Sequence, residues 1–312
     1  MKYIFGPVKS RRLGKSLGVD IVPYKLCSLN CVYCECGKTT DLTTEIKDYV
    51  PVGDVIEELD SFLQRSPDLD VITFSGSGEP TLNKSIDIFI NHLKSKYSQY
   101  KVAVLTNSTL LYMPEIRKKI SQADMIFPSL DAVSSQVFEK MLRPAKGVTP
   151  EQIIEGLIAL RKEYKGKIFL EIFIIEGLND TESELKLLKE ASIKINPDEI
   201  HINSLDRDSA EKWVTEARMN RLQEIKEFFA PLPSKIIAKA QDKKTNHYRV
   251  SEELQSKILN SITSLPKSLE EISTLTDARV ADIIKAAKEL EKQGLAGLKE
   301  DRESGKLFIF KL

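Results

Sequence analysis

The sequence predicts an α/β protein, a partial (β/α)6 barrel followed by a C-terminal winged helix-turn-helix domain. Two observations lead to the barrel. Six short apolar runs alternate with six stretches of helical periodicity, an order typical of a parallel sheet with its helices outside. Polar residues follow the apolar runs directly, and parallel barrels carry their sites at the C-terminal ends of their strands. Six units are fewer than a complete barrel needs, so we expect an incomplete one.

The predicted strands share runs of aliphatic and aromatic residues bounded by polar or turn-forming residues. We expect them at residues 17–22, 70–74, 101–105, 125–127, 168–174 and 199–203. The predicted helices share apolar residues three or four positions apart, which places these residues on one helical face. We expect them at residues 52–66, 84–96, 114–121, 150–164, 180–194 and 210–229. Together these elements predict a barrel domain over residues 1–230.

The chain changes character after residue 230. Residues 231–250 begin with two prolines and continue with five basic residues against one acid, which indicates a linker or a segment that wraps the barrel. Residues 251–312 then show three helical stretches and a hairpin, with Ser268 as an expected N-cap and Ser304-Gly305 at the hairpin tip. This order of elements is typical of a winged helix-turn-helix domain.

All four cysteines of the 312-residue chain fall within one short stretch, at Cys27, Cys31, Cys34 and Cys36. The first three have the spacing C-x3-C-x2-C, which lets three thiolates hold one face of a cubane [4Fe–4S] cluster. Full ligation of such clusters uses four cysteines, so three leave one iron open for another ligand. We expect Cys36 to be a spare thiol close to the cluster.

The four cysteines are also compatible with a zinc site or a disulfide. With Cys36 the motif becomes C-x3-C-x2-C-x-C, which could hold a tetrahedral zinc ion, although zinc sites usually have two separated pairs and no second pair exists here. A disulfide is less favoured, because residues 1–24 contain no apolar run of signal length. Clustered cysteines without a secretory signal indicate an intracellular metal site. We therefore expect a cytoplasmic protein without a membrane span.

The cysteine spacing, with Tyr33 before the last cysteine of the motif, resembles the radical S-adenosylmethionine (SAM) superfamily. The resemblance implies that SAM chelates the open iron of the cluster. An electron, supplied by a donor such as flavodoxin or ferredoxin, then cleaves SAM to a 5′-deoxyadenosyl radical, which takes a hydrogen atom from the substrate.

The N-terminal pattern, from Gly6-Pro7 through Ser10-Arg11-Arg12-Leu13-Gly14 to the cysteines, is similar to the branch of wyosine-type tRNA-modifying enzymes. Those enzymes, and the cyclases of molybdenum-cofactor synthesis, carry a second cluster ligated by further cysteines. This chain has no cysteine outside residues 27–36. A second cysteine-ligated cluster is therefore excluded.

A glycine-rich stretch follows the second predicted strand, with Gly76, Ser77, Gly78 and Glu79 before a proline. It resembles the superfamily motif that receives the amino group of SAM. Glycines let a backbone approach a ligand closely, and a carboxylate accepts hydrogen bonds from an ammonium group. An ordinary glycine turn after a strand is the alternative.

Further polar residues follow the third and fourth strands. By position, Asn107, Ser129 and Asp131 resemble ribose and methionine-carboxylate contacts of the superfamily, although these residue types are also common in turns. Arg143 could pair with the SAM carboxylate or be solvated.

The last two strands carry polar residues of their own. Glu171 lies within an apolar strand, where a carboxylate is costly unless it has a partner or faces a lumen. We therefore expect it inside the barrel, in contact with SAM or substrate. His201 is either a substrate contact or a satisfied interior histidine, and Asp206-Arg207-Asp208 is a candidate substrate loop.

Charge is balanced over the chain, with 46 Lys and Arg against 46 Asp and Glu, so composition indicates no polyelectrolyte partner. Residues 251–312 carry ten basic and eleven acidic residues, a weak footprint for phosphate binding. The domain shape, the basic linker and the tRNA-modifying resemblance still favour RNA as the partner of the winged helix. A peptide or protein substrate, or a packing role, is the alternative. A non-enzymatic, metal-dependent DNA-binding regulator also stays open.

Overall fold

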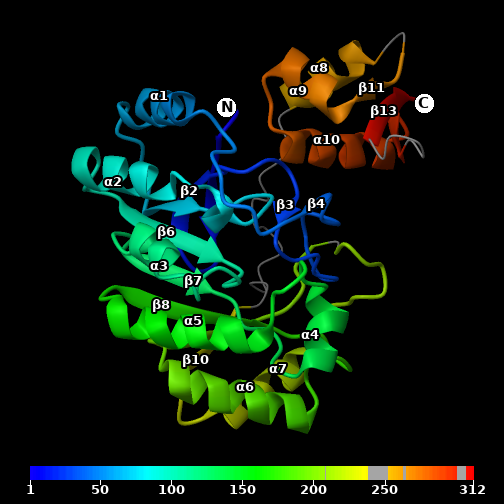
Figure 1. Cartoon of the computed structure of the whole chain (residues 1–312). Coiled ribbons are helices and arrows are strands. Elements are labelled where there is room, and N and C mark those ends of the chain that lie inside the picture. Colours follow the sequence, from blue (N-terminus) through cyan, green and yellow to red (C-terminus); the bar gives the residue numbers. More distant parts are fainter. Residues whose placement is uncertain (208, 238–251, 263–264, 301–306) are drawn as a thin grey trace. The chain divides into compact units, whose positions relative to one another are not determined.

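The computed structural model describes residues 1–207, 209–237, 252–262, 265–300 and 307–312, and the chain forms two compact units. One unit comprises residues 7–245 and the other comprises residues 1–6 together with residues 246–312 (Figure 1). No helix in these described ranges is long and apolar enough to cross a membrane.

The larger unit is built on a curled eight-stranded sheet that forms an open half barrel (Figure 1). Its strands, in spatial order, are β1 (Ile4–Ser10), β2 (Gly14–Val19), β5 (Val71–Phe74), β6 (Lys101–Thr106), β7 (Met125–Pro128), β8 (Lys167–Phe173), β9 (Glu199–Asn203) and β10 (Ser234–Ile237). Each neighbouring pair from β2 to β10 is parallel. The carboxyl ends of these strands therefore meet at one edge of the sheet, which is where parallel barrels carry their sites.

Amphipathic helices follow the strands and cover the outside of the sheet (Figure 1). They are α1 (Val52–Leu63), the single-turn η1 (Pro80–Leu82), α2 (Ile86–Lys96), α3 (Pro114–Ile120), α4 (Ser135–Leu142), α5 (Pro150–Glu163), α6 (Glu182–Ile195) and α7 (Met219–Phe229). Sequence signals set several of their starts: Thr149 and Gln152 form a capping box at α5, and the side chain of Thr181 caps α6.

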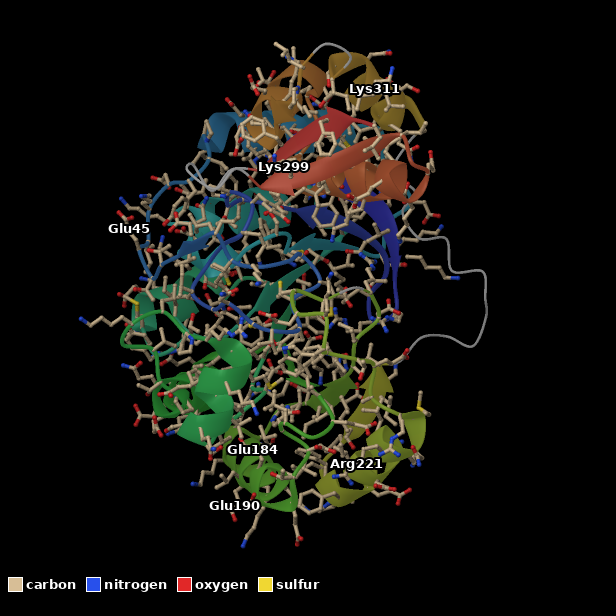
Figure 2. The ribbon with its side chains drawn as sticks, turned by 90° about the vertical axis from the view of Figure 1, so that its right-hand side faces the viewer. Glu45, Glu184, Glu190, Arg221, Lys299 and Lys311 are labelled. Carbon is tan, nitrogen blue, oxygen red and sulfur yellow. The ribbon has the colours of Figure 1, made fainter. Side chains whose placement is uncertain are left out.

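Charged side chains of the outer helices bind the loops that follow the strands. The carboxylate of Glu184 on α6 accepts hydrogen bonds from the backbone N–H groups of Val133 and Ser134, at 2.5 and 3.1 Å. Arg221 on α7 pairs with Asp180 at 2.9 Å. Figure 2 labels Glu184 and Arg221 among the side chains of this unit.

The predicted order of strands and helices is confirmed, with differences at the edges. The six predicted strands correspond to β2 and β5 to β9, but the sheet gains β1 and β10. The first was missed because Gly6 and Pro7 interrupt its apolar pattern. The second lies in the segment 231–250 that was expected to link or wrap; residues 238–250 of that segment lie outside the described residues.

Two helices also differ from the prediction. The helix α4 was not predicted, because its eight residues bury only Phe138, Met141 and Leu142. The helix α7 begins at Met219 rather than near residue 210. Residues before it are held elsewhere, since the N–H of Glu211 donates to the carbonyl of Val32 at 3.1 Å.

Side chains of the sheet alternate between two environments. On β8, Ile168, Leu170 and Ile172 are buried, whereas Phe169, Glu171 and Phe173 are half-buried on the opposite face. Phe169 packs on the apolar cluster of Val71, Ala103 and Phe127 from three neighbouring strands. The half-buried face of β8 is thus the inner face of the half barrel.

The smaller unit has the elements α8 (Glu252–Ser261), β11 (Lys267–Ser268), α9 (Leu269–Thr276), α10 (Val280–Lys292), β12 (Ala296–Glu300) and β13 (Leu307–Lys311). The strands form an antiparallel sheet in the order β11-β13-β12. The expected three helices and hairpin strands are therefore present, and Ser268 is the predicted N-cap, accepting from the N–H of Glu271 at 3.2 Å. The expected hairpin tip at Ser304-Gly305 lies outside the described residues.

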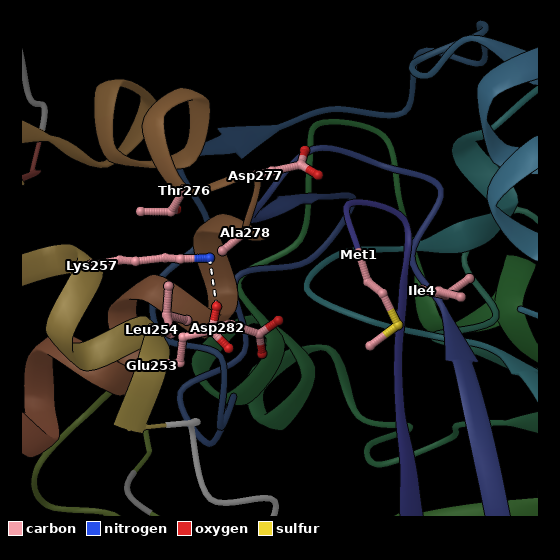
Figure 3. A pocket seen from close by; sticks show the side chains of 9 residues that line it. All are labelled: Met1, Ile4, Glu253, Leu254, Lys257, Thr276, Asp277, Ala278 and Asp282. Atoms are coloured by element: carbon pink, nitrogen blue, oxygen red, sulfur yellow. Dashed lines mark ion pairs between the residues drawn. The ribbon is translucent and has the colours of Figure 1, made fainter.

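The first residues of the chain belong to this smaller unit. The guanidinium of Arg279 lies 4.0 Å from the ring centroid of Phe5, within the range of a cation–π contact. A cavity of about 150 Å³ is lined by Met1 and Ile4 on one side and by residues of α8, α9 and the start of α10 on the other (Figure 3).

Candidate active site at the cysteine loop

The cysteine loop leaves the carboxyl end of β2 and is closed at its neck by a small two-stranded sheet of β3 (Leu26–Cys27) and β4 (Asp41–Leu42). The carbonyl of Lys25 accepts from the N–H groups of Thr40 and Asp41, at 3.1 and 3.2 Å. The carbonyl of Cys27 accepts from the N–H of Thr43 at 3.0 Å. The three cysteines of the motif therefore lie on a loop with fixed ends.

The end of α4 holds the middle of this loop. The last carbonyls of a helix lack partners within the helix. Here they accept from loop amides: Asn30 donates to Leu142, and Val32 donates to Met141, each at 2.9 Å. The helix ends at Arg143, which has a left-handed backbone with φ of +46°.

The environments of the three motif thiols differ. Burial raises the pKa of Cys27 to about 11, and burial with the charges of Cys27 and Cys34 raises the pKa of Cys31 well above its usual value. A hydrogen bond from Cys36 lowers the pKa of Cys34 to about 5, against the effect of burial and with the help of Lys25. The thiols lie close enough to influence one another's ionisation.

The residues present fit a cluster. Two of the sulfurs face hydrogen-bond donors: Lys25 Nζ lies 3.0 Å from Cys34 Sγ, and Asn107 Nδ2 lies 3.4 Å from Cys27 Sγ. Such donors stabilise thiolates, the form that ligates iron. Among the described residues, no three His, Cys, Asp or Glu side chains converge as one metal ion would require. A cubane binds each cysteine at a different iron, so its ligands need not meet at one point.

The glycine-rich loop after β5 packs directly against the cysteine loop. Gly78 allows this contact, because a Cβ there would lie 2.1 Å from the carbonyl oxygen of Leu26. Gly76, at φ of +151°, packs equally closely on the carboxylate of Asp20. Ser77 donates to that carboxylate from both its N–H and its Oγ, at 3.1 and 2.8 Å. Both glycines therefore allow the glycine-rich loop to pack on other parts of the protein, namely Leu26 and Asp20.

Glu79 is 2 % exposed, and its carboxylate accepts four hydrogen bonds from protein groups. Thr81 donates from its N–H and Oγ1, Thr106 from its Oγ1 and Asn107 from its N–H, at 2.6 to 3.0 Å. Burial raises the pKa of Glu79, against the effect of these hydrogen bonds. Three of these bonds fall on Oε1 and one on Oε2, and together they tie the loop after β5 to the end of β6. The role of Glu79 as acceptor for the amino group of SAM stays a prediction.

Asn107 is held from both sides of its amide. Its Nδ2 donates to Ser28 Oγ at 2.9 Å as well as to Cys27, and its Oδ1 accepts from the N–H and Oγ1 of Thr109. The structure therefore places this predicted ligand contact against the cysteine motif itself.

Tyr33 joins the cysteine loop to the ends of β7 and β8. Its ring stacks on Phe173 with 4.0 Å between centroids, and its hydroxyl donates to Asp131. The N–H of Phe173 donates to the other oxygen of Asp131 at 2.7 Å. Burial raises the pKa of Asp131 to about 6, against the effect of these two donors.

The other two predicted contacts, Ser129 and Arg143, are bound to different partners. Ser129 forms a backbone bridge with Glu171. Arg143 pairs with Glu211 at 2.6 Å and is half-exposed.

The inner face of the half barrel carries a second polar group. Glu171 forms an ion pair with Arg12, whose guanidinium also lies 5.9 Å from the ring centroid of Phe127. Burial, together with the charge of Arg11, lowers the pKa of Arg12 to about 10. Glu171 therefore lies on the inner face of the half barrel, as expected, and its partner there is Arg12.

His201 is paired with Glu171 in the register of β8 and β9 and is 4 % exposed. Its Nε2 lies 3.0 Å from a carboxylate oxygen of Glu199, whereas its Nδ1 has no hydrogen-bond partner among the described residues. Burial lowers the pKa of His201. A neutral ring that donates from Nε2 leaves Nδ1 as an acceptor.

The candidate substrate loop contacts the cysteine loop and the segment between β1 and β2 through Asp206 and Arg207. The N–H of Asp206 donates to the carboxylate of Glu35 at 3.1 Å, and Arg207 pairs with Glu35 at 4.0 Å. Asp206 also pairs with Arg11 at 3.5 Å. Asp208 lies outside the described residues.

Sequence reasoning missed two residues of this site. Asp20 carried a signal, since it is a carboxylate inside the predicted strand at residues 17–22. Lys25 carried none, because a lysine that is buried in a left-handed conformation is uncommon.

A half barrel with a three-cysteine loop at the carboxyl ends of its strands defines a class of protein that the comparisons identify. A family model described as the radical SAM superfamily matches residues 21–189, more than half of the chain. The chain therefore belongs to the radical SAM superfamily, whose members use SAM and a [4Fe–4S] cluster. It is an enzyme, an oxidoreductase or a transferase, and this sets aside the alternative of a non-enzymatic regulator.

Three of the individual similarities show what the chain resembles. The chain is 30 % identical over 275 residues to a UPF0026 protein of Methanocaldococcus jannaschii, covering 87 % of this chain and 85 % of that protein. It is 32 % identical over 290 residues to a protein of Brachyspira hyodysenteriae named GTPase Obg, covering 91 % of this chain but only 42 % of that protein's length. The crystal structure of a radical SAM methyltransferase from Sphaerobacter thermophilus matches with a TM-score of 0.57 at 15 % identity, over 71 % of this chain and 66 % of that one. The last similarity shows a shared fold.

Proposed function

We propose that the protein binds one [4Fe–4S] cluster through Cys27, Cys31 and Cys34, binds SAM beside it, and abstracts hydrogen from a substrate inside the half barrel. The observation that carries the proposal is the packing of the three-cysteine loop against the Gly76–Glu79 loop at the carboxyl ends of the parallel strands. When bound, the cluster supplies the electron that cleaves SAM to a 5′-deoxyadenosyl radical.

The residues around the cysteine loop would bind and orient SAM. Tyr33 lies in the loop itself and donates to Asp131, Asn107 lies against Cys27, and Ser129 follows the end of β7. We assign to these side chains and to the backbone of Gly76, Ser77 and Gly78 the contacts to ribose and to the methionine amino and carboxylate groups. Glu79 holds that loop against β6 through Oε1, which accepts from Thr81 and Thr106. Its Oε2 accepts one hydrogen bond, from Asn107, among the described residues, and we assign to this oxygen the contact to the amino group of SAM.

Arg143 and Glu171 belong to different parts of the proposed site. Arg143, at the end of α4, forms an ion pair with Glu211. Glu171 belongs to the substrate side, since it lies between Arg12 and His201 on the inner face. The buried Nδ1 of His201 supplies an acceptor there that a substrate N–H or O–H group can fill.

The remaining features concern partners. A reductant such as flavodoxin or ferredoxin would supply the electron, in the cytoplasm. We propose that the smaller unit, whose helices and antiparallel strands follow the order expected of a winged helix-turn-helix, docks a macromolecular substrate. We place RNA first, on the N-terminal resemblance to wyosine-type tRNA-modifying enzymes, and a peptide or protein second. The domains that we propose are residues 1–230, 231–250 and 251–312.

Iron analysis and electron paramagnetic resonance test this function. Anaerobic reconstitution should give one reducible cluster, and addition of SAM should change the spectrum of the reduced cluster, because SAM takes the open iron. Cys27→Ala, Cys31→Ala and Cys34→Ala should each lose the cluster, whereas Cys36→Ala should keep it. Loss of the cluster in Cys36→Ala with retention in one of the other three would refute the ligand assignment.

A further inference from the structure

Lys25 places a buried positive charge inside the cysteine loop. The residue is 3 % exposed, and its Nζ lies 3.0 Å from Cys34 Sγ. A lysine ammonium carries three donor hydrogens and is rarely buried without anionic partners. The sulfur of a cluster-forming cysteine is therefore a direct hydrogen-bond partner of this cation.

The backbone of Lys25 is fixed in a conformation that holds the side chain in place. Its φ of +58° is left-handed, which is uncommon for residues other than glycine. Its N–H donates to the carbonyl of Ser77 at 3.1 Å, and its own carbonyl accepts from Thr40 and Asp41. Both of its peptide groups are thus bound to neighbouring loops, and the residue connects the glycine-rich loop with the cysteine loop.

The counter-charge of Lys25 comes from sulfur. Within the described ranges, no carboxylate forms an ion pair with Lys25. A buried cation without an anionic partner is strongly unfavourable. Cys34 Sγ, 3.0 Å from Nζ, is the hydrogen-bond partner of this ammonium group. The loop therefore has an internal cation positioned for a set of thiolates.

We propose that Lys25 is a positioning residue that serves as the counter-cation of the cluster site and makes the cluster easier to reduce. The inference rests on the proposed function, because it assumes a cluster on Cys27, Cys31 and Cys34. Reduction adds one electron, and thus one negative charge, while no bond to Lys25 forms or breaks and no proton moves. Net charge and hydrogen bonds to sulfur are among the factors that set cluster potentials. A fixed cation at 3.0 Å stabilises the more negative, reduced state.

Three substitutions separate charge from hydrogen bonding at this position. Lys25→Met removes both, Lys25→Gln keeps a donor without charge, and Lys25→Arg keeps both. All three keep a Cβ, so the left-handed backbone is equally strained in each. Lys38→Met is the matched control, because Lys38 lies in the same loop with its side chain 64 % exposed.

The readout is a redox titration of the reconstituted protein without SAM, followed by electron paramagnetic resonance, with iron content measured for every variant. In Lys25→Met we expect the ratio of reduced to oxidised cluster at a fixed potential to fall at least tenfold, which is about 59 mV for one electron. Lys25→Gln should shift less in the same direction. Lys25→Arg and Lys38→Met should titrate like the wild type.

Each outcome decides the proposal. Loss of iron in both neutral variants with retention in Lys25→Arg also supports a counter-cation, because the thiolate-bound site then requires the charge. Unchanged iron and unchanged potential in Lys25→Met overturn the proposal. So does a loss of iron in Lys25→Arg equal to that in Lys25→Met. A wild-type protein that assembles no cluster refutes the proposed function itself, which distinguishes the two failures.

Discussion

The amide Nδ2 of Asn107, at the end of β6, lies 3.4 Å from the sulfur of Cys27, the first cysteine of the motif. The N–H of the same residue donates to Glu79 at 2.7 Å. Two segments that are far apart in the sequence, the cysteine loop and the glycine-rich loop, are thereby fixed to one strand end. A substitution that displaces one loop should therefore also displace the other.

Gly78 offers a direct test of this coupling. A methyl group at Gly78 would lie 2.1 Å from the backbone carbonyl of Leu26, so Gly78→Ala should displace the cysteine loop and reduce both iron content and SAM affinity. Gly53→Ala is the control, because Gly53 is a glycine of α1 with nothing within 4 Å of the added methyl. Iron analysis and SAM titration of both variants provide the measurement. Wild-type values in Gly78→Ala would show that the two loops are not coupled.

The pair of Arg12 and Glu171 should stabilise the half barrel. Its side chains are 22 % and 13 % exposed, so Glu171→Gln leaves a largely buried guanidinium without its partner, at a cost of roughly 3 kcal/mol. Glu45→Gln is the comparison, since Glu45 pairs with Lys47 and both side chains are more than half exposed, so it should cost about 1 kcal/mol or less. Urea denaturation gives both free energies of unfolding. Equal losses would mean that Arg12 has other support.

The carboxyl group of Asp60 should make the free energy of unfolding fall at acid pH. Burial raises the pKa of this carboxyl, but hydrogen bonds from Lys96, His92 and Tyr97 outweigh burial and lower it to about 2. A depressed folded-state pKa means that the unfolded chain binds the proton first as pH falls. The contribution is therefore present above about pH 4 and is lost as the pH falls toward 2.

Because the group is partly solvated, we expect this contribution to be about 1 kcal/mol. Thermal unfolding between pH 2 and 5 would measure it against Asp60→Asn, which should lack this part of the slope. An identical pH profile for the variant would contradict the assignment.

Salt dependence tests RNA binding by the smaller unit. Lys288 and Lys292 are exposed on α10, so replacing both by Glu should weaken binding to bulk tRNA and reduce the salt slope by about two if both contact phosphate. Lys101→Glu with Lys118→Glu makes the same change of charge at exposed positions of the barrel unit. Equal effects of the two pairs, or no binding by the wild type, would leave peptide or protein docking as the role of this unit.

The sequence was sufficient for the parts of the fold that depend on periodicity. The strands β2 and β5 to β9 are apolar runs with clear boundaries, and their alternation with helices predicted the parallel half barrel. The strands β1 and β10 were missed because Gly6, Pro7 and the two prolines before Ser234 obscure their pattern. Edge strands tolerate such residues, since one side of their backbone lacks a partner strand.

The sequence indicated which residues belong to the candidate site but not which of them contact one another. The spacing of the cysteines predicted the cluster ligands, and the resemblance to a superfamily motif predicted the Gly76–Glu79 loop. The hydrogen bonds that Glu79 accepts from Thr81, Thr106 and Asn107 depend on how two strand ends meet, which no local pattern encodes. Lys25 is the clearest example, because its backbone is bound by Ser77 of the glycine-rich loop and by Thr40 and Asp41 at the neck of the cysteine loop.

Formation of 5′-deoxyadenosine tests the central claim most directly. The reconstituted protein, reduced under anaerobic conditions and supplied with SAM, should release 5′-deoxyadenosine, detected by liquid chromatography and mass spectrometry. A variant with Cys27, Cys31 and Cys34 all changed to Ala should release none, and Cys36→Ala should match the wild type. If the wild type carries a reducible cluster and yet forms no more 5′-deoxyadenosine than the triple variant, the proposed SAM cleavage at the cysteine loop is wrong.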